Sequence, residues 1–168
     1  MEHSDEDRVV YWDACIFIAW ITGEARPPGE QDGIRECVRK LGKKLVVVVT
    51  SSFTSTEVLV GNMPQEAQSA YGRLMRSIEV IDLEPPILRL ARELREHFQR
   101  EKHAGRQRGV IAAADALHLA TAINRNVDAF YTFDRGTKDK VSLLSLSGNV
   151  AGHPLKVCKP PVSQLSLF

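Results

Sequence analysis

The stretch Val9-Val10-Tyr11-Trp12-Asp13 places four strand-forming residues directly before a single carboxylate. β-Branched and aromatic side chains in a row indicate a buried strand, so the acid stands at its carboxyl end. In a parallel α/β sheet, ligands collect at that end, because helices cover both faces and the crevice opens beyond the strand tips. Asp13 is therefore a candidate site residue, although an acid here can also simply cap the turn that follows.

Outward from this strand, the sequence alternates between strand and helix patterns. The aliphatic run at 45–50 is apolar on both alternating faces, which is typical of a strand inside a parallel sheet. Further strands are expected at 77–82, 127–133 and 155–159. Helices are expected at 16–21, 34–41, 53–60 and 67–74, from Pro85 onward, and at 111–126. This alternation predicts an α/β domain with a mainly parallel sheet.

Length and composition set further limits. The 168 residues suit one domain, which we expect to span 1–159, followed by a C-terminal tail at 160–168. A net charge of +1 excludes a protein that coats nucleic acid by bulk electrostatics, so contact with nucleic acid requires a local basic patch. The three cysteines are far apart and fit reduced thiols. With an acidic start and no long apolar run, we expect a cytoplasmic protein with no membrane contact.

Three more acids follow a strand or stand in the helix beyond it: Glu57, Asp115 and Asp134. Right-handed crossovers place these positions and Asp13 along one edge of the sheet. Converging acids without a counter-charge raise one another's pKa and cost stability. Mg²⁺ removes this conflict, because it takes oxygen ligands and keeps waters, one of which can attack a phosphodiester. We therefore predict that all four acids form a catalytic metal site.

Each of these acids also has a structural explanation. Glu57 can complete a capping box that begins at Thr54, and so reach back to the chain rather than to a ligand. Asp115 in a first helical turn complements the helix dipole without any further role. His118, one turn after Asp115, is expected on the helix surface without a metal role, because water activation does not require it.

Four blocks of the sequence together resemble the PIN domain family. They are Tyr11-Trp12-Asp13, Ser51 to Glu57, Ala114 to Ala120 and Val127 to Asp134. The likeness spans about Val9 to Val157 in the family's order, and it is strongest to VapC-type toxin ribonucleases. It implies a three-layer α/β/α fold and an Mg²⁺- or Mn²⁺-dependent endoribonuclease that cuts single-stranded RNA. The residues that match the family's metal-site acids are Asp13, Glu57, Asp115 and Asp134.

The same resemblance implies a homodimer that a small antitoxin inhibits by covering the acidic pocket. Thr132 matches the family's hydroxyl two residues before the last acid, where it can orient a carboxylate or a water. The chain departs from the family at Cys15, where a polar residue is usual, and at 135–139, which replaces a shorter segment. These departures bear on substrate choice more than on metal binding.

A basic loop is expected at 100–109, just before the third acid. Its cations either grip RNA phosphates or belong to a solvated linker. They are Arg100, Lys102, Arg106 and Arg108.

The chain ends in Gln164-Leu165-Ser166-Leu167-Phe168, which resembles the short motif by which bacterial replication and repair proteins dock on the sliding clamp. In that interpretation, Gln164 supplies a polar contact while Leu165, Leu167 and Phe168 enter apolar pockets. Packing of the tail on its own domain or on a partner subunit is the alternative.

The sequence as a whole predicts a metal-dependent endoribonuclease of the toxin type. A non-catalytic PIN module that binds RNA or protein is one alternative, and a DNA-associated nuclease recruited to the clamp is another. A phosphotransfer enzyme with Asp13 as nucleophile is disfavoured, because such enzymes typically need a second acid where this chain has Cys15.

Overall fold

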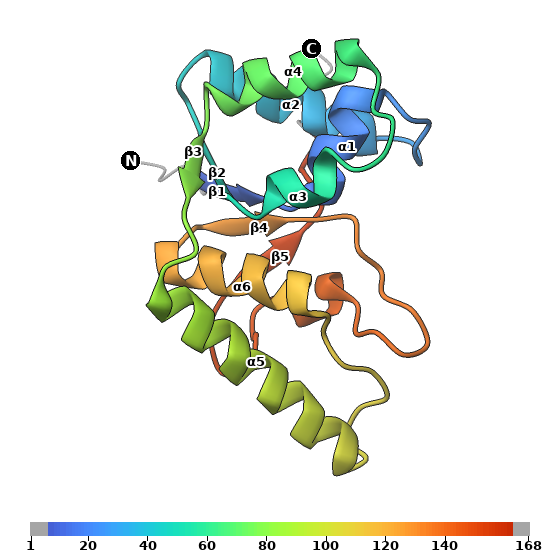
Figure 1. Ribbon diagram of the computed structural model, residues 1–168, viewed down its shortest axis with the longest axis vertical. Helices are drawn as coiled ribbons and strands as arrows, with labels where there is room; N and C mark the ends of the chain where they lie inside the picture. Colours follow the sequence, from blue (N-terminus) through green and yellow to red (C-terminus); the bar gives the residue numbers. More distant parts are fainter. Residues whose placement is uncertain (1–6, 163–168) are drawn as a thin grey trace, which may run out of the picture.

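A five-stranded, all-parallel sheet lies between two layers of helices in the computed structural model, which describes residues 7–162 (Figure 1). The predicted α/β/α fold is confirmed. The elements in chain order are β1 (Val9–Trp12), α1 (Ala14–Thr22), α2 (Glu30–Gly42), β2 (Val47–Ser51), α3 (Thr54–Val58), α4 (Gln65–Met75), β3 (Glu79–Ile81), α5 (Pro85–His103), α6 (Ala113–Arg125), β4 (Ala129–Tyr131), η1 (Leu143–Leu146) and β5 (Lys156–Cys158). The tail residues Gln164, Leu165, Leu167 and Phe168 lie outside the described residues.

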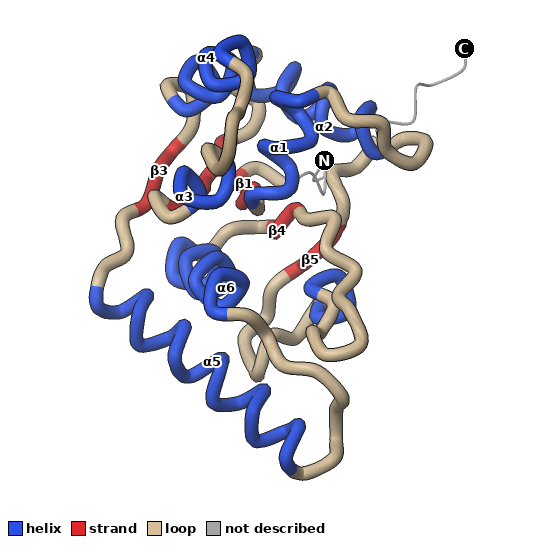
Figure 2. The backbone as a smooth tube through the Cα atoms, turned by 45° about the vertical axis from the view of Figure 1, so that its right-hand side comes forward, coloured by secondary structure: helices blue, strands red, loops and turns tan. Residues whose placement is uncertain are grey.

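The strand order is β3-β2-β1-β4-β5, so the chain first adds strands on one side of β1 and then, from β4, on the other. Because crossovers are right-handed, this reversal puts α1 to α4 on one face of the sheet and α5 with α6 on the other (Figure 2). Val10 of β1 pairs with Val48 on one side and with Ala129 on the other. A crevice is expected beyond the carboxyl ends of β1 and β4, where the direction changes.

Alternate residues of β1 enter different layers of the core. Tyr11 packs in the cluster with α5 and α6, whereas Val10 and Trp12 pack in the cluster with α1 and α2. The central strands are therefore apolar on both faces, as expected of a parallel sheet covered on both sides. Trp12 is fully buried, and its truncation to alanine is expected to cost about 3–5 kcal/mol.

The helix ends follow from local sequence. α1 begins directly after Asp13, whose carboxylate accepts from the Ala14 amide, and ends at Gly23 with a φ of 61°. α5 begins at Pro85, as proline suits a first helical turn, and continues through His103. The basic loop that we expected from residue 100 therefore starts later, because its first cations form the last turn of α5, where they complement the helix dipole.

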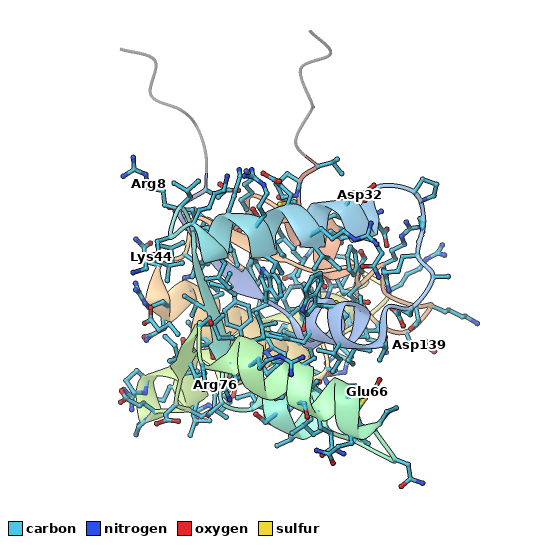
Figure 3. The ribbon with its side chains drawn as sticks, turned by 90° about the horizontal axis from the view of Figure 1, so that it is seen from above. Arg8, Asp32, Lys44, Glu66, Arg76 and Asp139 are labelled. Carbon is cyan, nitrogen blue, oxygen red and sulfur yellow. The ribbon has the colours of Figure 1, made fainter. Side chains whose placement is uncertain are left out.

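The two ends of the parallel strands define two sides of the molecule. In Figure 3, Asp32, Glu66 and Asp139 lie on one side, which is the side of the helix N-termini and strand exits. Arg8 and Lys44, which precede strands, lie on the opposite side. None of the helices in the described range 7–162 has the length and apolar character needed to cross a membrane.

Candidate active site

The four predicted acids all lie at the carboxyl edge of the sheet. Asp13 is the N-cap of α1 at the exit of β1, and Glu57 stands in α3 after β2. Asp115 is in the first turn of α6, and Asp134 follows β4. The structure brings them into one neighbourhood but divides them into two pairs, one bridged by the His118 imidazole and the other by the Lys140 ammonium.

Thr132 connects the first acid to the last. Its hydroxyl donates to Asp13 Oδ2 at 2.7 Å and accepts from the Asp134 amide at 3.0 Å, and the residue is fully buried. Asp13 Oδ1 accepts from the Ala14 amide at 2.8 Å and so caps α1. Asp13 thus serves as a helix cap through Oδ1 and joins the exit of β4 through Oδ2, and the two interpretations are compatible.

Cys15 acts as a polar residue in this setting. Its thiol lies 3.4 Å from Asp13 Oδ2, and its sulfur accepts from the Phe133 amide at 3.3 Å. Burial, followed by the negative charge of Asp13, holds the pKa of the thiol well above its ordinary value. Cys15 therefore stays a neutral donor that helps to join the exits of β1 and β4.

His118 is part of the site rather than of the surface, so the prediction of a surface histidine was wrong. Its side chain is 1% exposed, and Nε2 contacts Glu57 Oε2 and lies 3.9 Å from Asp13 Oδ1. Nδ1 is 2.7 Å from the Tyr11 hydroxyl, which accepts from the Ser51 amide. Burial alone would lower the pKa of His118, but the hydrogen bond with Glu57 and the charge of Asp13 hold it above its ordinary value.

The capping box predicted as an alternative for Glu57 is not formed. α3 has Phe53 at its N-cap with no side-chain capping bond, while Thr54 pairs with the Thr50 hydroxyl inside the core. The carboxylate of Glu57 is therefore free to reach His118 on α6, on the other face of the sheet.

Lys140 bridges the second pair of acids, and sequence reasoning did not identify it. Its Nζ lies 2.9 Å from Asp115 Oδ2 and 3.6 Å from Asp134 Oδ2. The pKa of Asp115 is raised, chiefly by burial and further by Asp13 and Asp134, against the opposing effect of Lys140. The pKa of Lys140 is raised as well, since its interaction with Asp115 outweighs its own burial.

Two further contacts hold the segment after β4. Asp134 Oδ1 accepts from the Gly136 amide at 2.9 Å, which closes a tight turn behind the acid. Arg135 lies 3.5 Å from Glu30, a buried carboxylate at the start of α2 that also pairs with Lys159 at 2.7 Å. The position of Asp134 is thus fixed by the turn at Gly136 and, through its neighbour Arg135, by the start of α2.

Comparison with known proteins agrees with this geometry. The sequence profile of the PIN domain matches residues 10–141. The chain belongs to the PIN domain family. This confirms the resemblance drawn from the sequence blocks. No curated protein matches the sequence of this PIN domain.

Solved structures share the fold of this PIN domain. The VapBC2 complex of Rickettsia felis bound to promoter DNA has a TM-score of 0.62 at 17% identity and covers 89% of this chain and 98% of that chain. A toxin–antitoxin complex from Klebsiella pneumoniae has a TM-score of 0.56 at 21% identity, over 90% and 98% of the two chains. The sarcin-ricin loop cleaving toxin VapC20 of Mycobacterium tuberculosis has a TM-score of 0.52 at 18% identity, over 75% and 90%.

The donor set of the PIN domain fits a hard divalent cation by type. Asp115 Oδ2 and Asp134 Oδ2 are buried and accept no hydrogen bond of good geometry from the described residues. Carboxylate oxygens of this kind are the ligands that Mg²⁺ and Mn²⁺ prefer. As the side chains stand, no three His, Cys, Asp or Glu residues within 7–162 lie close enough together to hold a metal ion. A cation site built from three or more of these acids would therefore need them to move toward one another and away from His118 and Lys140.

A basic groove adjoins the Lys140 half of the site. It has a volume of about 490 Å³, and the cations in its lining are Arg108, Arg135, Lys138 and Lys140. Arg108 is the one predicted RNA-binding residue that this groove includes. Arg106 is instead paired with Glu101 through two hydrogen bonds. Arg100 lines a separate hollow along α5.

Proposed function

We propose that this PIN domain is a divalent-metal-dependent endoribonuclease that cuts single-stranded RNA in the cytoplasm, and that it is the toxin of a toxin–antitoxin pair. The observation that carries the proposal is the gathering of Asp13, Asp115 and Asp134 at the switch point of the sheet, with Thr132 holding the first and last acids together. The sarcin-ricin loop cleaving toxin and the toxin–antitoxin complexes among the structural neighbours support it.

The chemistry expected at this site is hydrolysis of a phosphodiester. A bound Mg²⁺ or Mn²⁺ neutralises charge on the phosphate and makes water a better nucleophile. Asp13, Asp115 and Asp134 are the residues that would hold the cation, with Glu57 as a fourth oxygen donor. Thr132 fixes the direction of the Asp13 carboxylate by donating to Oδ2, while the Ala14 amide donates to Oδ1. His118 keeps Glu57 and Asp13 from repelling each other before the cation binds.

RNA is expected to approach along the basic groove. Phosphates need cations, and the groove places Arg108, Arg135 and Lys138 beside the acids. Because the net charge of the chain is only +1, this local patch, rather than the whole surface, supplies the attraction.

A cleavage assay tests the proposal. Metal-free protein should leave a labelled single-stranded RNA intact, and added Mn²⁺ should start cleavage. Asp13→Asn should abolish cleavage without changing the fold, since asparagine keeps the size of the side chain. Asp139→Asn is the matched control, because Asp139 is an exposed acid in the loop after Asp134, and the substitution removes one charge without touching the site. Equal cleavage by wild type and Asp13→Asn would refute the assignment.

A non-catalytic PIN module is the second candidate. It is favoured by His118 and Lys140, which already neutralise part of the acidic cluster, and by the lack of a preformed three-ligand metal site in the described residues. RNA binding that is unaffected by Mn²⁺, together with no cleavage of any RNA supplied, would establish this candidate instead.

Partners are part of the proposal. The Rickettsia and Klebsiella neighbours are toxin–antitoxin complexes, which supports a small antitoxin as partner. Co-expression with the product of an adjacent small reading frame should rescue growth, and light scattering should report a homodimer. Sliding-clamp docking stays a prediction for the tail, and a clamp pull-down with and without residues 164–168 decides it, since equal recovery rejects docking.

A further inference from the structure

Lys140 differs from an ordinary surface lysine in what its ammonium contacts. The group lies 2.9 Å from Asp115 Oδ2 and 3.6 Å from Asp134 Oδ2. Both oxygens are buried and accept no hydrogen bond of good geometry in the described chain. The Lys140 ammonium therefore supplies positive charge to Asp115 Oδ2 and Asp134 Oδ2, the two buried carboxylate oxygens without a hydrogen bond of good geometry.

The backbone at Lys140 is fixed, so the fold itself sets where the ammonium lies. Lys140 forms a parallel bridge with Val110, and its carbonyl accepts from the Thr137 amide at 2.9 Å. Two glycines allow this approach. A Cβ on Gly109 would lie 2.8 Å from the Val141 amide nitrogen, and Gly136 has a φ of 72° that other residues rarely adopt.

A divalent cation must use the oxygens that the ammonium now contacts. A cation bound to Asp115 Oδ2 lies about 2.1 Å from it. With Lys140 Nζ only 2.9 Å from the same oxygen, two positive centres would stand within about 5 Å of each other, where repulsion is substantial. The ammonium therefore opposes the binding of a divalent cation to this oxygen for as long as it stays there.

We propose that Lys140 is a built-in competitor for the metal site, which occupies the Asp115–Asp134 side and must leave before a divalent cation binds there. This inference rests on the proposed function, in which these acids bind the cation. In the absence of metal, Lys140 holds the two acids together, and in its presence Lys140 weakens the affinity. The protein is thus expected to bind Mn²⁺ more weakly than its four acids alone would.

Calorimetric titration of Mn²⁺ into the metal-free full chain tests the proposal without any activity measurement. Lys140→Met should lower the dissociation constant for Mn²⁺ by about tenfold or more, because the repulsion is removed. Lys140→Arg keeps the charge and should stay close to wild type. Lys138→Met is the control for general electrostatics, since this exposed lysine lies in the same loop and its loss should change the affinity by less than about threefold.

Each outcome separates the inference from the function on which it rests. Tighter binding by Lys140→Met alone supports the inference. Equal affinity of wild type and Lys140→Met, or an equal gain in Lys138→Met, overturns it while the metal site survives. Lack of Mn²⁺ binding by every protein overturns the proposed function and the inference together. If Lys140→Met does not fold, Lys140→Gln replaces it, with circular dichroism to check the fold.

Discussion

The two basic side chains of the acidic site, His118 and Lys140, are held in different ways. His118 stands on α6 in the interior, 1% exposed, and is fixed by Tyr11 on one side and Glu57 on the other. Lys140 comes from a loop and its side chain is 34% exposed, although its backbone is fixed. The His118 side of the site is therefore part of the core, whereas on the Lys140 side a divalent cation could replace the ammonium.

Loss of His118 should have the largest effect on stability. His118→Leu leaves Glu57 without the buried imidazole that it contacts and takes away one of the partners of the Tyr11 hydroxyl, which keeps the Ser51 amide, so the free energy of unfolding should fall by about 3 kcal/mol. Water reaches part of Glu57, which keeps the loss from being larger. Urea denaturation measures it. His103→Leu, at an exposed position in the last turn of α5, should stay within about 0.5 kcal/mol of wild type.

Tyr11→Phe tests the contact between the Tyr11 hydroxyl and His118 Nδ1. The variant removes a buried hydroxyl that accepts from the Ser51 amide and contacts His118 Nδ1, while the ring stays stacked on Phe130. The free energy of unfolding should fall by about 1.5 kcal/mol. A double-mutant cycle with His118→Leu should show strong coupling between the two residues, and additive losses would contradict the contact.

Lys140→Met should cost less than either change in the core. The Lys140 side chain is one third exposed, so water screens the ion pairs, and the free energy of unfolding in EDTA should fall by about 1 kcal/mol. If Lys140→Met lost as much free energy of unfolding as His118→Leu, Lys140 would be as much a part of the core as His118. That result would contradict the difference between the two sides of the site.

The pH dependence should be the smallest effect. Because the pKa of His118 is raised in the folded protein, the folded state binds the proton more tightly than the unfolded state does. The stabilisation is complete below about pH 6.5 and is lost as the pH rises through the folded pKa, by less than about 1.4 kcal/mol per pH unit. Denaturation in EDTA between pH 6 and 9 should show this fall.

Glu57→Gln serves as the control for the pH series. The variant removes the carboxylate that raises the pKa of His118, so the fall in stability over this range should be smaller. An identical fall in the variant, or a rise in wild-type stability with pH, would contradict the assignment.

Much of the site could be predicted from chain connectivity. Asp13 and Asp134 follow strands, and parallel strands with right-handed crossovers bring such positions to one edge whatever the details of packing. Asp115 needed only the start of a helix. These acids were found because their placement depends on topology rather than on side-chain conformation, whereas Thr132 was predicted from the resemblance to the PIN domain family.

His118 was missed because the helical pattern was interpreted as having one buried stripe. α6 lies between the sheet and α5, so it is buried on most sides, including position 118. Small apolar residues all round the helix, together with an inward-facing Tyr11, were the signal that could have revealed it. Lys140 carried no such signal, because its position depends on the positive φ of Gly136 and on a bridge to Val110.

Titration of Mn²⁺ into metal-free wild type, Asp13→Asn and Asp139→Asn, followed by calorimetry and thermal unfolding, tests the central claim most directly. Wild type and Asp139→Asn should bind Mn²⁺ and gain about 2.7 kcal/mol of stability when free Mn²⁺ is a hundredfold above the dissociation constant. Asp13→Asn should lose both the binding and the gain. Equal binding by Asp13→Asn, or a wild type that does not respond to Mn²⁺, would contradict a metal site at this edge of the sheet.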